Sequence, residues 1–273
     1  MQWYDWHIER EDWEAFRALQ DDSEVIALMK SGVYREIALD PREVLRCENQ
    51  GYQGSCRGHS GSTGSEWIRI LATHEVDVQL SRAMMYYETQ RIDRLSGDVG
   101  STIMGGVKLL AEVGLCEEKL WPYPPRYNNA RPANYQAVLE NAAIHKVKTS
   151  RRITSYDGIR AFLGSGQGYV DCGIPWSSRY AAPVVEQWVG GNGGHAIGLF
   201  VLSERKDSQG RPYVWMFNSH GESSGVVGWS EWAPAMVEQA MRQQMSVFVG
   251  LSDMPNVTPR EFTIEDAKKA LRI

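Results

Sequence analysis

The chain has few of the features that mark metal-binding, membrane or secreted proteins. It contains four cysteines and six histidines among 273 residues, but no Cys-x-x-Cys pair and no His-x-x-x-His pair, which are common spacings of zinc ligands. We therefore expect no metal and no cofactor. No run of about 18 apolar residues is present, so we expect no membrane association. The first residues have neither the cationic nor the apolar stretch of a secretory signal peptide.

Charge of one sign does not dominate either. The 29 basic and 34 acidic side chains give a formal net charge of −5, so we expect no nucleic-acid partner. The basic stretch at 145–152 is more typical of a strand edge that lysine protects from further pairing. Because the chain lacks the disulfide-rich cysteine pattern of secreted domains, we expect a reducing compartment such as the cytoplasm.

The order of the hydrophobic patterns indicates the fold class. A length of 273 residues, 42% of them hydrophobic, suffices for one large domain or two lobes with a full core. Helix-like segments occupy the chain up to Ala143, and strand-like segments follow at 169–174, 195–202, 212–217 and 246–250. Helices first and strands later predict an α+β fold. We divide the chain into an N-terminal helical extension (1–36), a helical lobe (37–143), a β lobe (144–252) and a C-terminal appendage (253–273).

Aromatic residues recur at helical spacing near the beginning of the chain. Trp3, Trp6, Trp13 and Phe16 form one stripe beside acidic residues. The simplest prediction from this pattern is a helix packed on the body of the protein. A second hypothesis is that this aromatic segment binds a protein partner or covers a cleft.

Three distant residues provide the main indication of function. Cys56 lies in a Gly/Ser-rich stretch, His195 begins an apolar segment after two glycines, and Asn218 ends another. A thiol, an imidazole and a carboxamide in this order are the groups of a cysteine hydrolase, in which the imidazole activates the thiol and the amide orients the imidazole. A cysteine hydrolase is therefore the leading hypothesis.

Other catalytic or phosphate-binding motifs fit less well. Gly54-Ser55-Cys56-Arg57-Gly58 has the form of an α/β-hydrolase nucleophile elbow, but that motif requires a buried apolar strand before it, whereas residues 46–53 are polar. Such hydrolases also place the orienting acid before the histidine, and Asn218 follows it. The glycine-rich segments 164–168 and 190–194 lack the strand-then-helix order or the lysine of phosphate-binding loops, so both are predicted to be turns.

The motifs resemble the papain family of cysteine peptidases. His195 follows Cys56 by 139 residues, within the range of about 130–150 for that family, and Gln53-Gly54-Ser55-Cys56-Arg57 matches its local signature at three of five positions. Gly114-Leu115-Cys116-Glu117 with Leu120-Trp121-Pro122-Tyr123 resembles bacterial and viral members, and the resemblance extends over about 37–250. It implies a helical lobe with a central helix, an antiparallel β-barrel-like lobe, and hydrolysis of a peptide or protein substrate through an acyl-enzyme.

The resemblance implies a role for each candidate site residue. Cys56 is the nucleophile, and a Cys56 thiolate beside a His195 imidazolium is the resting pair. His195 later donates its proton to the leaving amine, and Asn218 orients His195. Gln50 donates a hydrogen bond to the substrate carbonyl oxygen as negative charge develops there. The edge that binds the substrate backbone is placed at Gly97, Asp98, Gly100 and Gly194.

The segment from Cys56 to Leu71 gives conflicting indications. Gly58, Gly61 and Gly64 each cost a helix about 1 kcal/mol relative to alanine, so propensity predicts a linker. The resemblance instead implies the central helix, in which glycines three residues apart would allow close backbone contact with the opposite lobe. We follow the resemblance and expect a helix.

Two residues depart from the family pattern. Arg57 follows the nucleophile where the family has an aromatic residue, and one hypothesis is that its charge lowers the pKa of Cys56. His220 stands where the family has a tryptophan that shields the histidine–asparagine contact; it either replaces part of that shield or competes for Asn218. The departures support a second hypothesis, a papain-fold structural or binding module of a larger assembly, such as a virus particle, with weak or no catalysis.

Overall fold

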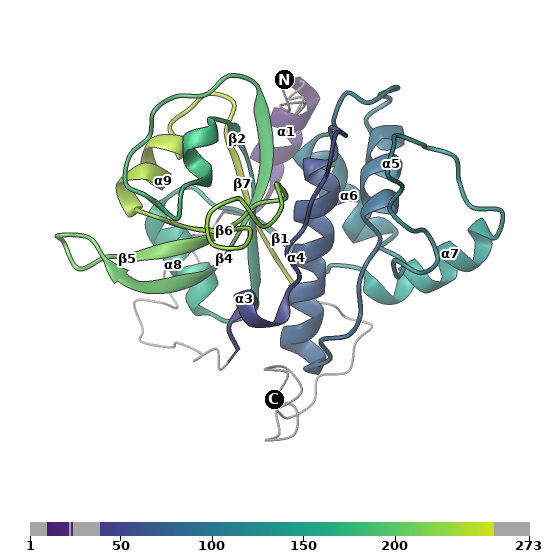
Figure 1. Cartoon of the computed structure of the whole chain (residues 1–273), viewed down its shortest axis with the longest axis horizontal. Helices are drawn as coiled ribbons and strands as arrows, with labels where there is room; N and C mark the ends of the chain where they lie inside the picture. Colours follow the sequence, from purple (N-terminus) through teal and green to yellow (C-terminus); the bar gives the residue numbers. More distant parts are fainter. Residues whose placement is uncertain (1–9, 22, 24–38, 254–273) are drawn as a thin grey trace.

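The computed structural model describes residues 10–21, 23 and 39–253. A group of helices lies on one side of the molecule, and a sheet with further helices lies on the other, so the chain forms two lobes (Figure 1). The prediction of a two-lobe α+β fold is therefore confirmed. Trp3 and Trp6, and the predicted C-terminal appendage beyond Asp253, lie outside the described residues.

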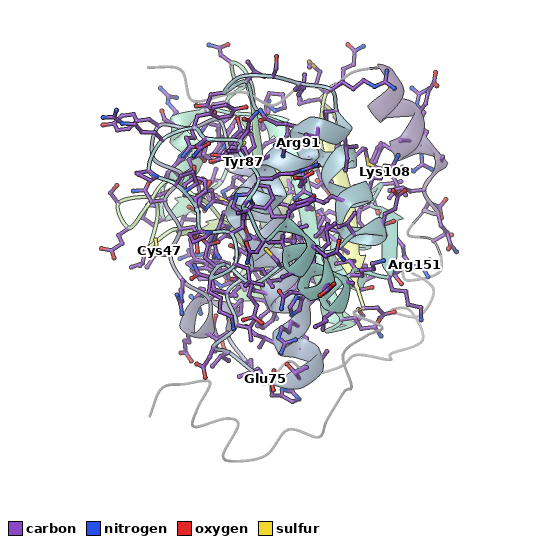
Figure 2. The ribbon with its side chains drawn as sticks, turned by 90° about the vertical axis from the view of Figure 1, so that its right-hand side faces the viewer. Cys47, Glu75, Tyr87, Arg91, Lys108 and Arg151 are labelled. Atoms are coloured by element: carbon purple, nitrogen blue, oxygen red, sulfur yellow. The ribbon has the colours of Figure 1, made fainter. Side chains whose placement is uncertain are left out.

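The first lobe consists of helices. They are α4 (Cys56–Thr73), α5 (Arg82–Ile92), α6 (Ile103–Glu112) and α7 (Tyr135–Ala142), followed by the 3-10 helix η1 (Ala143–His145). Figure 2 looks onto this lobe, with Tyr87 and Arg91 on α5 and Lys108 on α6. The short α3 (Pro41–Val44) precedes α4, and α1 (Arg10–Ala18) packs against α6 with Phe16 in the core. The described part of the aromatic N-terminal segment is thus a helix on the body of the protein.

The second lobe contains a seven-stranded sheet in the order β1-β7-β2-β4-β5-β6-β3. The strands are β1 (Thr149–Arg152), β2 (Gly168–Pro175), β3 (Val184–Val185), β4 (Gly194–Lys206), β5 (Pro212–Phe217), β6 (Trp229–Trp232) and β7 (Val247–Ser252). Neighbouring strands are antiparallel except β3 and β6, which are parallel. The helices α8 (Tyr156–Gly164) and α9 (Pro234–Met241) and the 3-10 helix η2 (Ser178–Ala181) complete the lobe.

The helix α4 lies between α5 and the sheet and is the predicted central helix. Gly58 approaches α5 so closely that a β-carbon there would lie 2.9 Å from the carbonyl oxygen of Arg82. A β-carbon at Gly64 would lie 1.9 Å from the ring of Tyr169 in β2. Glycine therefore permits close packing on both sides of α4, and this packing offsets the low helix propensity of the segment.

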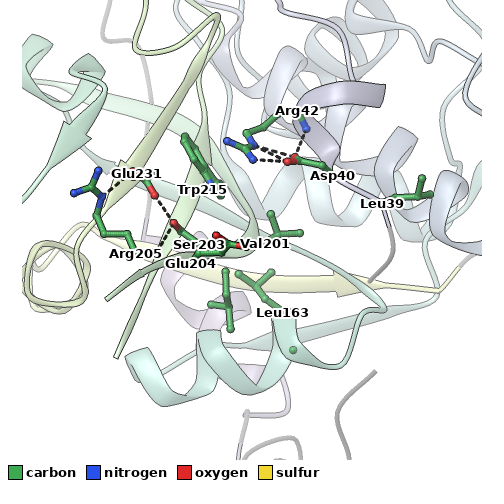
Figure 3. Close-up of a pocket in the computed structure, with 12 residues that line it drawn as sticks. Leu39, Asp40, Arg42, Leu163, Val201, Ser203, Glu204, Arg205, Trp215 and Glu231 are labelled. Atoms are coloured by element: carbon green, nitrogen blue, oxygen red, sulfur yellow. Dashed lines mark hydrogen bonds and ion pairs between the residues drawn. The ribbon is translucent and has the colours of Figure 1, made fainter. Parts of the chain in front are cut away.

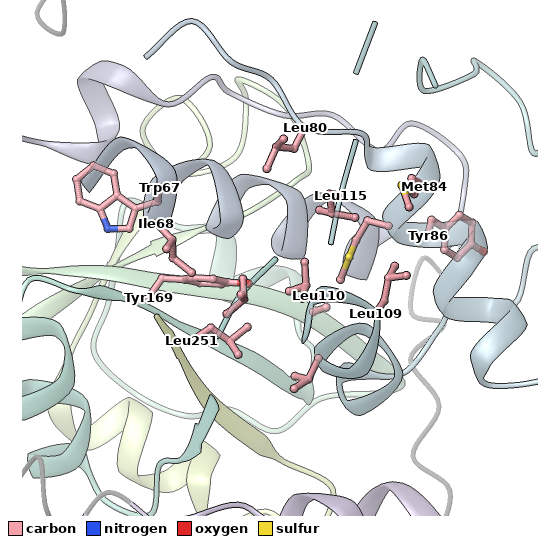
Figure 4. Close-up of a cluster of buried hydrophobic side chains, with 14 of the residues drawn as sticks. Trp67, Ile68, Leu80, Met84, Tyr86, Leu109, Leu110, Leu115, Tyr169 and Leu251 are labelled. Atoms are coloured by element: carbon pink, nitrogen blue, oxygen red, sulfur yellow. The ribbon is translucent and has the colours of Figure 1, made fainter. Parts of the chain in front are cut away.

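Large buried side chains fill the space around α4 (Figure 4). Trp67 and Ile68 of α4 belong to one cluster with Tyr169, whose ring stacks on Phe200 of β4 with centroids 5.3 Å apart. The same cluster continues into the helical lobe through Leu80, Met84, Leu109, Leu110 and Leu115. Full burial of a side chain of this kind contributes about 1.5–3 kcal/mol. The core therefore fixes α4, and with it the residue at which α4 begins.

A buried ion pair joins α4 to the sheet. Arg57 Nη2 lies 2.9 Å from Asp171 Oδ2 in β2, and both side chains are fully buried. The guanidinium also occupies the space that β-carbons at Gly61 and Gly106 would need. Burial raises the pKa of Asp171 to about 6, and Arg57 opposes that shift. Arg57 thus has Asp171 as its ionic partner, which gives it a structural role. The hypothesis that its charge lowers the pKa of Cys56 stays a prediction.

All four cysteines are described, and none of them forms a disulfide. Within residues 10–21, 23 and 39–253, no helix is both long and apolar enough to span a membrane. In that same part of the chain, no three His, Cys, Asp or Glu side chains gather in a way that could hold a metal ion.

Candidate active site

The two lobes meet where α4 begins and β4 begins. Cys56 is the first residue of α4 and is 1% exposed. Its Sγ accepts a hydrogen bond from the backbone N–H of Ala196 at 3.4 Å. Ala196 directly follows His195 in β4, so the fold places the thiol beside the strand segment that carries the imidazole.

The ring of His195 is held by Asn218, which directly follows β5. His195 Nε2 lies 2.9 Å from Asn218 Oδ1. Because a carboxamide oxygen only accepts, Nε2 carries the proton. Nδ1 is buried and makes no hydrogen bond to any described residue. In the neutral ring Nδ1 is therefore the nitrogen that can accept a proton. The hydrogen bond to Asn218 determines this tautomer.

Two further contacts orient the amide of Asn218. Its Nδ2 donates to Ser224 Oγ at 2.9 Å and to His220 Nδ1 at 3.2 Å. Its backbone N–H donates to Gly228 O at 2.9 Å. With both acceptors on the Nδ2 side, Oδ1 is directed to His195. Sequence reasoning missed Ser224, since a serine in a glycine-rich loop carries no signal of such a role.

Aromatic rings cover the contact between His195 and Asn218. The ring of His220 stacks on that of His195, with centroids 4.6 Å apart and an interplanar angle of 28°. Trp176, which directly follows β2, lies 4.4 Å from His195 and meets His220 edge-on at 5.7 Å. This chain has no tryptophan at position 220 to shield the contact. His220 and Trp176 together form the shield in its place.

Burial determines the charge state of these imidazoles. It lowers the pKa of His195 well below its usual range, and the neighbouring His220 acts in the same direction while Asn218 opposes it. Burial also lowers the pKa of His220 to about 4, with a further contribution from His59. The surroundings therefore favour a neutral His195, in contrast to the imidazolium of the resting pair that the family resemblance implies.

Gln50 is anchored beside the nucleophile loop. Its Nε2 donates to Gln53 O at 2.9 Å, and its Oε1 accepts from Ser219 Oγ at 2.6 Å. The backbone around it pairs with the segment that follows Asn218: Gln50 N–H donates to Ser219 O at 2.8 Å, and Gly221 N–H donates to Glu48 O at 2.9 Å. Gln50 is 2% exposed, and its side-chain amide has a second N–H beyond the one donated to Gln53.

Tyr123 links the two ends of the nucleophile loop. Its hydroxyl lies 2.9 Å from Gln50 O and 2.5 Å from Ser55 Oγ. The motif that contains Tyr123 is visible in the sequence, but the hydroxyl contact is not, because it joins residues more than 65 positions apart. Tyr123 thereby holds the residue before Cys56 and the glutamine of the same loop in one arrangement.

The predicted substrate-binding residues lie in two places, the loop at 97–100 and the beginning of β4 at Gly194. Asp98 Oδ1 accepts from the backbone N–H of Gly54 at 2.8 Å and from Tyr86 Oη at 2.7 Å, so this side chain braces the nucleophile loop. The carbonyls of Gly97 and Gly100 each accept from Gln90 Nε2 at 2.9 Å. Gly194 is buried and begins β4 opposite Pro175. Of the four predicted residues, Gly97 is the exposed one.

A separate cavity of about 710 Å³ lies toward the far end of β4 (Figure 3). Arg42 stands 4.0 Å over the ring of Trp215 on one wall, and Arg205 pairs with Glu231 at 2.9 Å on another. Val201, which also lines the cavity, is six residues beyond His195. At roughly 3.3 Å per strand residue this is about 20 Å, so the cavity is not part of the candidate active site.

No protein-family model matches the chain, and no curated protein is significantly similar to it in sequence. Solved structures are similar to it in fold. Xylellain, a cysteine protease from Xylella fastidiosa, is 21% identical with a TM-score of 0.70, over 94% of this chain and 96% of that one. The proform of the ragweed pollen allergen Amb a 11, a cysteine protease, is 17% identical with a TM-score of 0.66, over 93% and 77%. Bromelain from Ananas comosus, bound to the inhibitor E64, is 14% identical with a TM-score of 0.60, over 78% and 97%.

These similarities confirm the predicted fold. The chain has the two-lobe architecture of papain-like cysteine proteases, with the central helix in one lobe and the sheet in the other. At identities of this size the comparison concerns the fold alone.

Proposed function

We propose that the protein is a papain-like cysteine peptidase that cleaves peptide bonds with Cys56, His195 and Asn218. One observation carries the proposal. The Cys56 thiol accepts from the backbone N–H next to His195, and the ring of His195 is held in turn by the amide of Asn218. These two contacts support the proposal, because nucleophilic catalysis by a thiol uses an imidazole near the sulfur and a group that orients the imidazole.

In the proposed reaction, His195 Nδ1 takes the thiol proton as Cys56 Sγ attacks the carbonyl carbon of the substrate. The C–N bond then breaks, His195 gives the proton to the leaving amine, and a thioester remains on Cys56. Water, deprotonated by the same nitrogen, hydrolyses the thioester and restores the thiol. Asn218 accepts the Nε2–H throughout, which keeps Nδ1 as the nitrogen that takes and gives the proton.

The negative charge on the carbonyl oxygen needs hydrogen-bond donors. We assign this role to the second Nε2–H of Gln50 and to the backbone N–H of Cys56 at the beginning of α4. Loss of one such donor typically costs about 2.7–4 kcal/mol of barrier, or about 10²–10³ in kcat. The Gln50→Glu variant, which keeps the size of the side chain and replaces its donor by an anion, should lose at least that factor.

The proposed substrate is a peptide or protein that binds along the loop at Gly97. Gln90 holds both carbonyls of this loop, and Asp98 ties the loop to Gly54, so its distance from Cys56 is fixed. A fixed, exposed backbone edge beside the nucleophile is suited to binding an extended peptide. The cysteine proteases among the solved structures agree with this substrate class.

A cysteine-directed epoxide tests the proposal. The protein is incubated with an E-64-type inhibitor at neutral pH, and the modified residue is located by mass mapping. We expect one adduct, on Cys56, and none in the Cys56→Ala variant. Cys47 is the matched control because it is the partly exposed cysteine, and burial raises the pKa of its thiol. Equal labelling of Cys47 and Cys56 would contradict an activated nucleophile.

A papain-fold binding module without catalysis is the second candidate. The depth of the site favours it: Cys56 is 1% exposed, His195 is fully buried, and burial lowers the pKa of His195. Iodoacetamide rates separate the two candidates. A Cys56 thiol that reacts no faster than Cys47, together with the absence of peptide cleavage, would support the binding module.

A further inference from the structure

We infer that His220 is a positioning residue of the proposed peptidase, which holds Asn218 in its working orientation only while the His220 ring is neutral. The inference rests on the proposed function and extends it to the pH range in which the site operates. Its basis is the pair of contacts that His220 makes, one with Asn218 and one with His195.

The first contact orients the amide of Asn218. A carboxamide can sit in two orientations that differ by exchange of its oxygen and its nitrogen. Asn218 Nδ2 lies 3.2 Å from His220 Nδ1, so a neutral His220 with Nδ1 unprotonated accepts this hydrogen bond. A protonated His220 presents an N–H to the same NH₂ group, which favours the exchanged amide. The NH₂ group of the exchanged amide would then face the Nε2–H of His195. Because both groups are donors, the hydrogen bond that holds the His195 ring would be lost.

The second contact places His220 over the reacting ring. The two imidazoles stack with centroids 4.6 Å apart. During turnover His195 becomes positively charged, and a neutral neighbour tolerates that charge while a charged one repels it. Protonation of His220 therefore opposes catalysis in two ways, through the amide of Asn218 and through the charge of His195.

The groups around His220 keep it neutral over most of the pH range. His195 from β4 and His59 from α4 are the titratable groups whose charges act on it, and Trp176 adjoins it without charge. His59 Nδ1 lies 3.1 Å from Glu48, which also pairs with Arg82. Burial and His59 lower the pKa of His220 to about 4. The change of state is therefore expected in acid, near that pH.

Two variants separate the effect of the His220 ring from the effect of its acceptor atom Nδ1. His220→Phe keeps a stacking ring but removes both the acceptor and the titration, whereas His220→Asn keeps an acceptor near the position of Nδ1 and also removes the titration. We expect kcat at pH 7 to fall about tenfold in His220→Phe, the rate equivalent of one orienting hydrogen bond, with KM little changed. His220→Asn should retain more of the wild-type kcat than His220→Phe does.

The pH profile between 3 and 8 is the decisive measurement, with folding at each pH checked by circular dichroism. For wild type, log(kcat/KM) should fall in acid with a slope that approaches two, because His195 and His220 each inactivate the site when protonated. Both variants should show a slope of one. Equal slopes in wild type and both variants, or an unchanged kcat in His220→Phe, would overturn the inference.

The rate of Cys56 alkylation by iodoacetamide distinguishes this failure from failure of the proposed function. A wild-type Cys56 that is no more reactive than Cys47 would refute the peptidase itself. A reactive Cys56 whose rate follows the same pH profile in wild type and in His220→Phe would leave the peptidase intact and refute only the role of His220.

Discussion

Replacement of Arg57 by methionine tests the ion pair that joins α4 to the sheet. Methionine keeps a long side chain but removes the guanidinium 2.9 Å from Asp171. Asp171 is fully buried, so its carboxylate loses the ionic partner without gaining water. Removing one partner of such a pair costs about 3–5 kcal/mol. This is a large part of the roughly 5–15 kcal/mol by which folded domains are stable.

Urea unfolding at pH 7 and pH 5 measures the effect. Burial places the pKa of Asp171 at about 6, above its ordinary value of 3.8, even with Arg57 present. A carboxyl with a raised folded-state pKa stabilises the fold at low pH and less as pH rises from about 4 through that pKa. Without Arg57 the shift should increase, so Arg57→Met should lose less stability at pH 5 than at pH 7.

The double variant Arg57→Met/Asp171→Leu is the control. Replacing both partners of a buried ion pair by apolar residues is often neutral, so its unfolding free energy should lie close to that of wild type. A single variant within about 1 kcal/mol of wild type at pH 7 would refute the structural role. A stable double variant in which Cys56 reacts tenfold more slowly with iodoacetamide would instead support the hypothesis that Arg57 acts on the thiol.

Three further predictions concern packing, the nucleophile loop and acid stability. Gly64→Ala should lower the unfolding free energy by at least about 1 kcal/mol in urea titrations, since its β-carbon would meet the Tyr169 ring at 1.9 Å. Tyr123→Phe removes the hydroxyl that contacts Gln50 O and should reduce kcat about three- to tenfold, with a melting temperature within a few degrees of wild type. The contribution of His220 to stability should be complete above about pH 6.5 and be lost toward pH 4, because its pKa is lowered in the fold. In calorimetry across that window, His220→Phe should therefore lose less stability with falling pH than wild type does.

The α+β class and the central helix could be predicted from the sequence, but for different reasons. The change from helical to strand-like periodicity after Ala143 follows from local patterning. The helix over Cys56–Thr73 contradicts local propensity, because Gly58 and Gly64 are favourable only against the backbone of α5 and the ring of Tyr169. Such contacts exist only in the folded protein and leave no local pattern in the sequence. The helix was therefore predictable only through resemblance to a known family.

The short strands and the second layer of the site could not be predicted. The strands β3 and β6 have four residues or fewer, too few to show an alternating pattern. Trp176 and Ser224 reach His195 and Asn218 through the arrangement of loops, and no spacing in the sequence encodes that. Arg57 directly follows the thiol in sequence, but its guanidinium pairs with Asp171 of β2 in space, and no sequence pattern indicates that partner.

The backbone bonds between the segment before the nucleophile and the segment after Asn218 constrain how the lobes can separate. Gln50 pairs with Ser219, and Gly221 pairs with Glu48, so this end of the interface is a two-sided seam that joins the lobes. Separation of the lobes at this end would therefore have to break both backbone hydrogen bonds. The spacing between the nucleophile loop and the segment after Asn218 is thus set by the main chain itself and does not depend on which side chains these two segments carry.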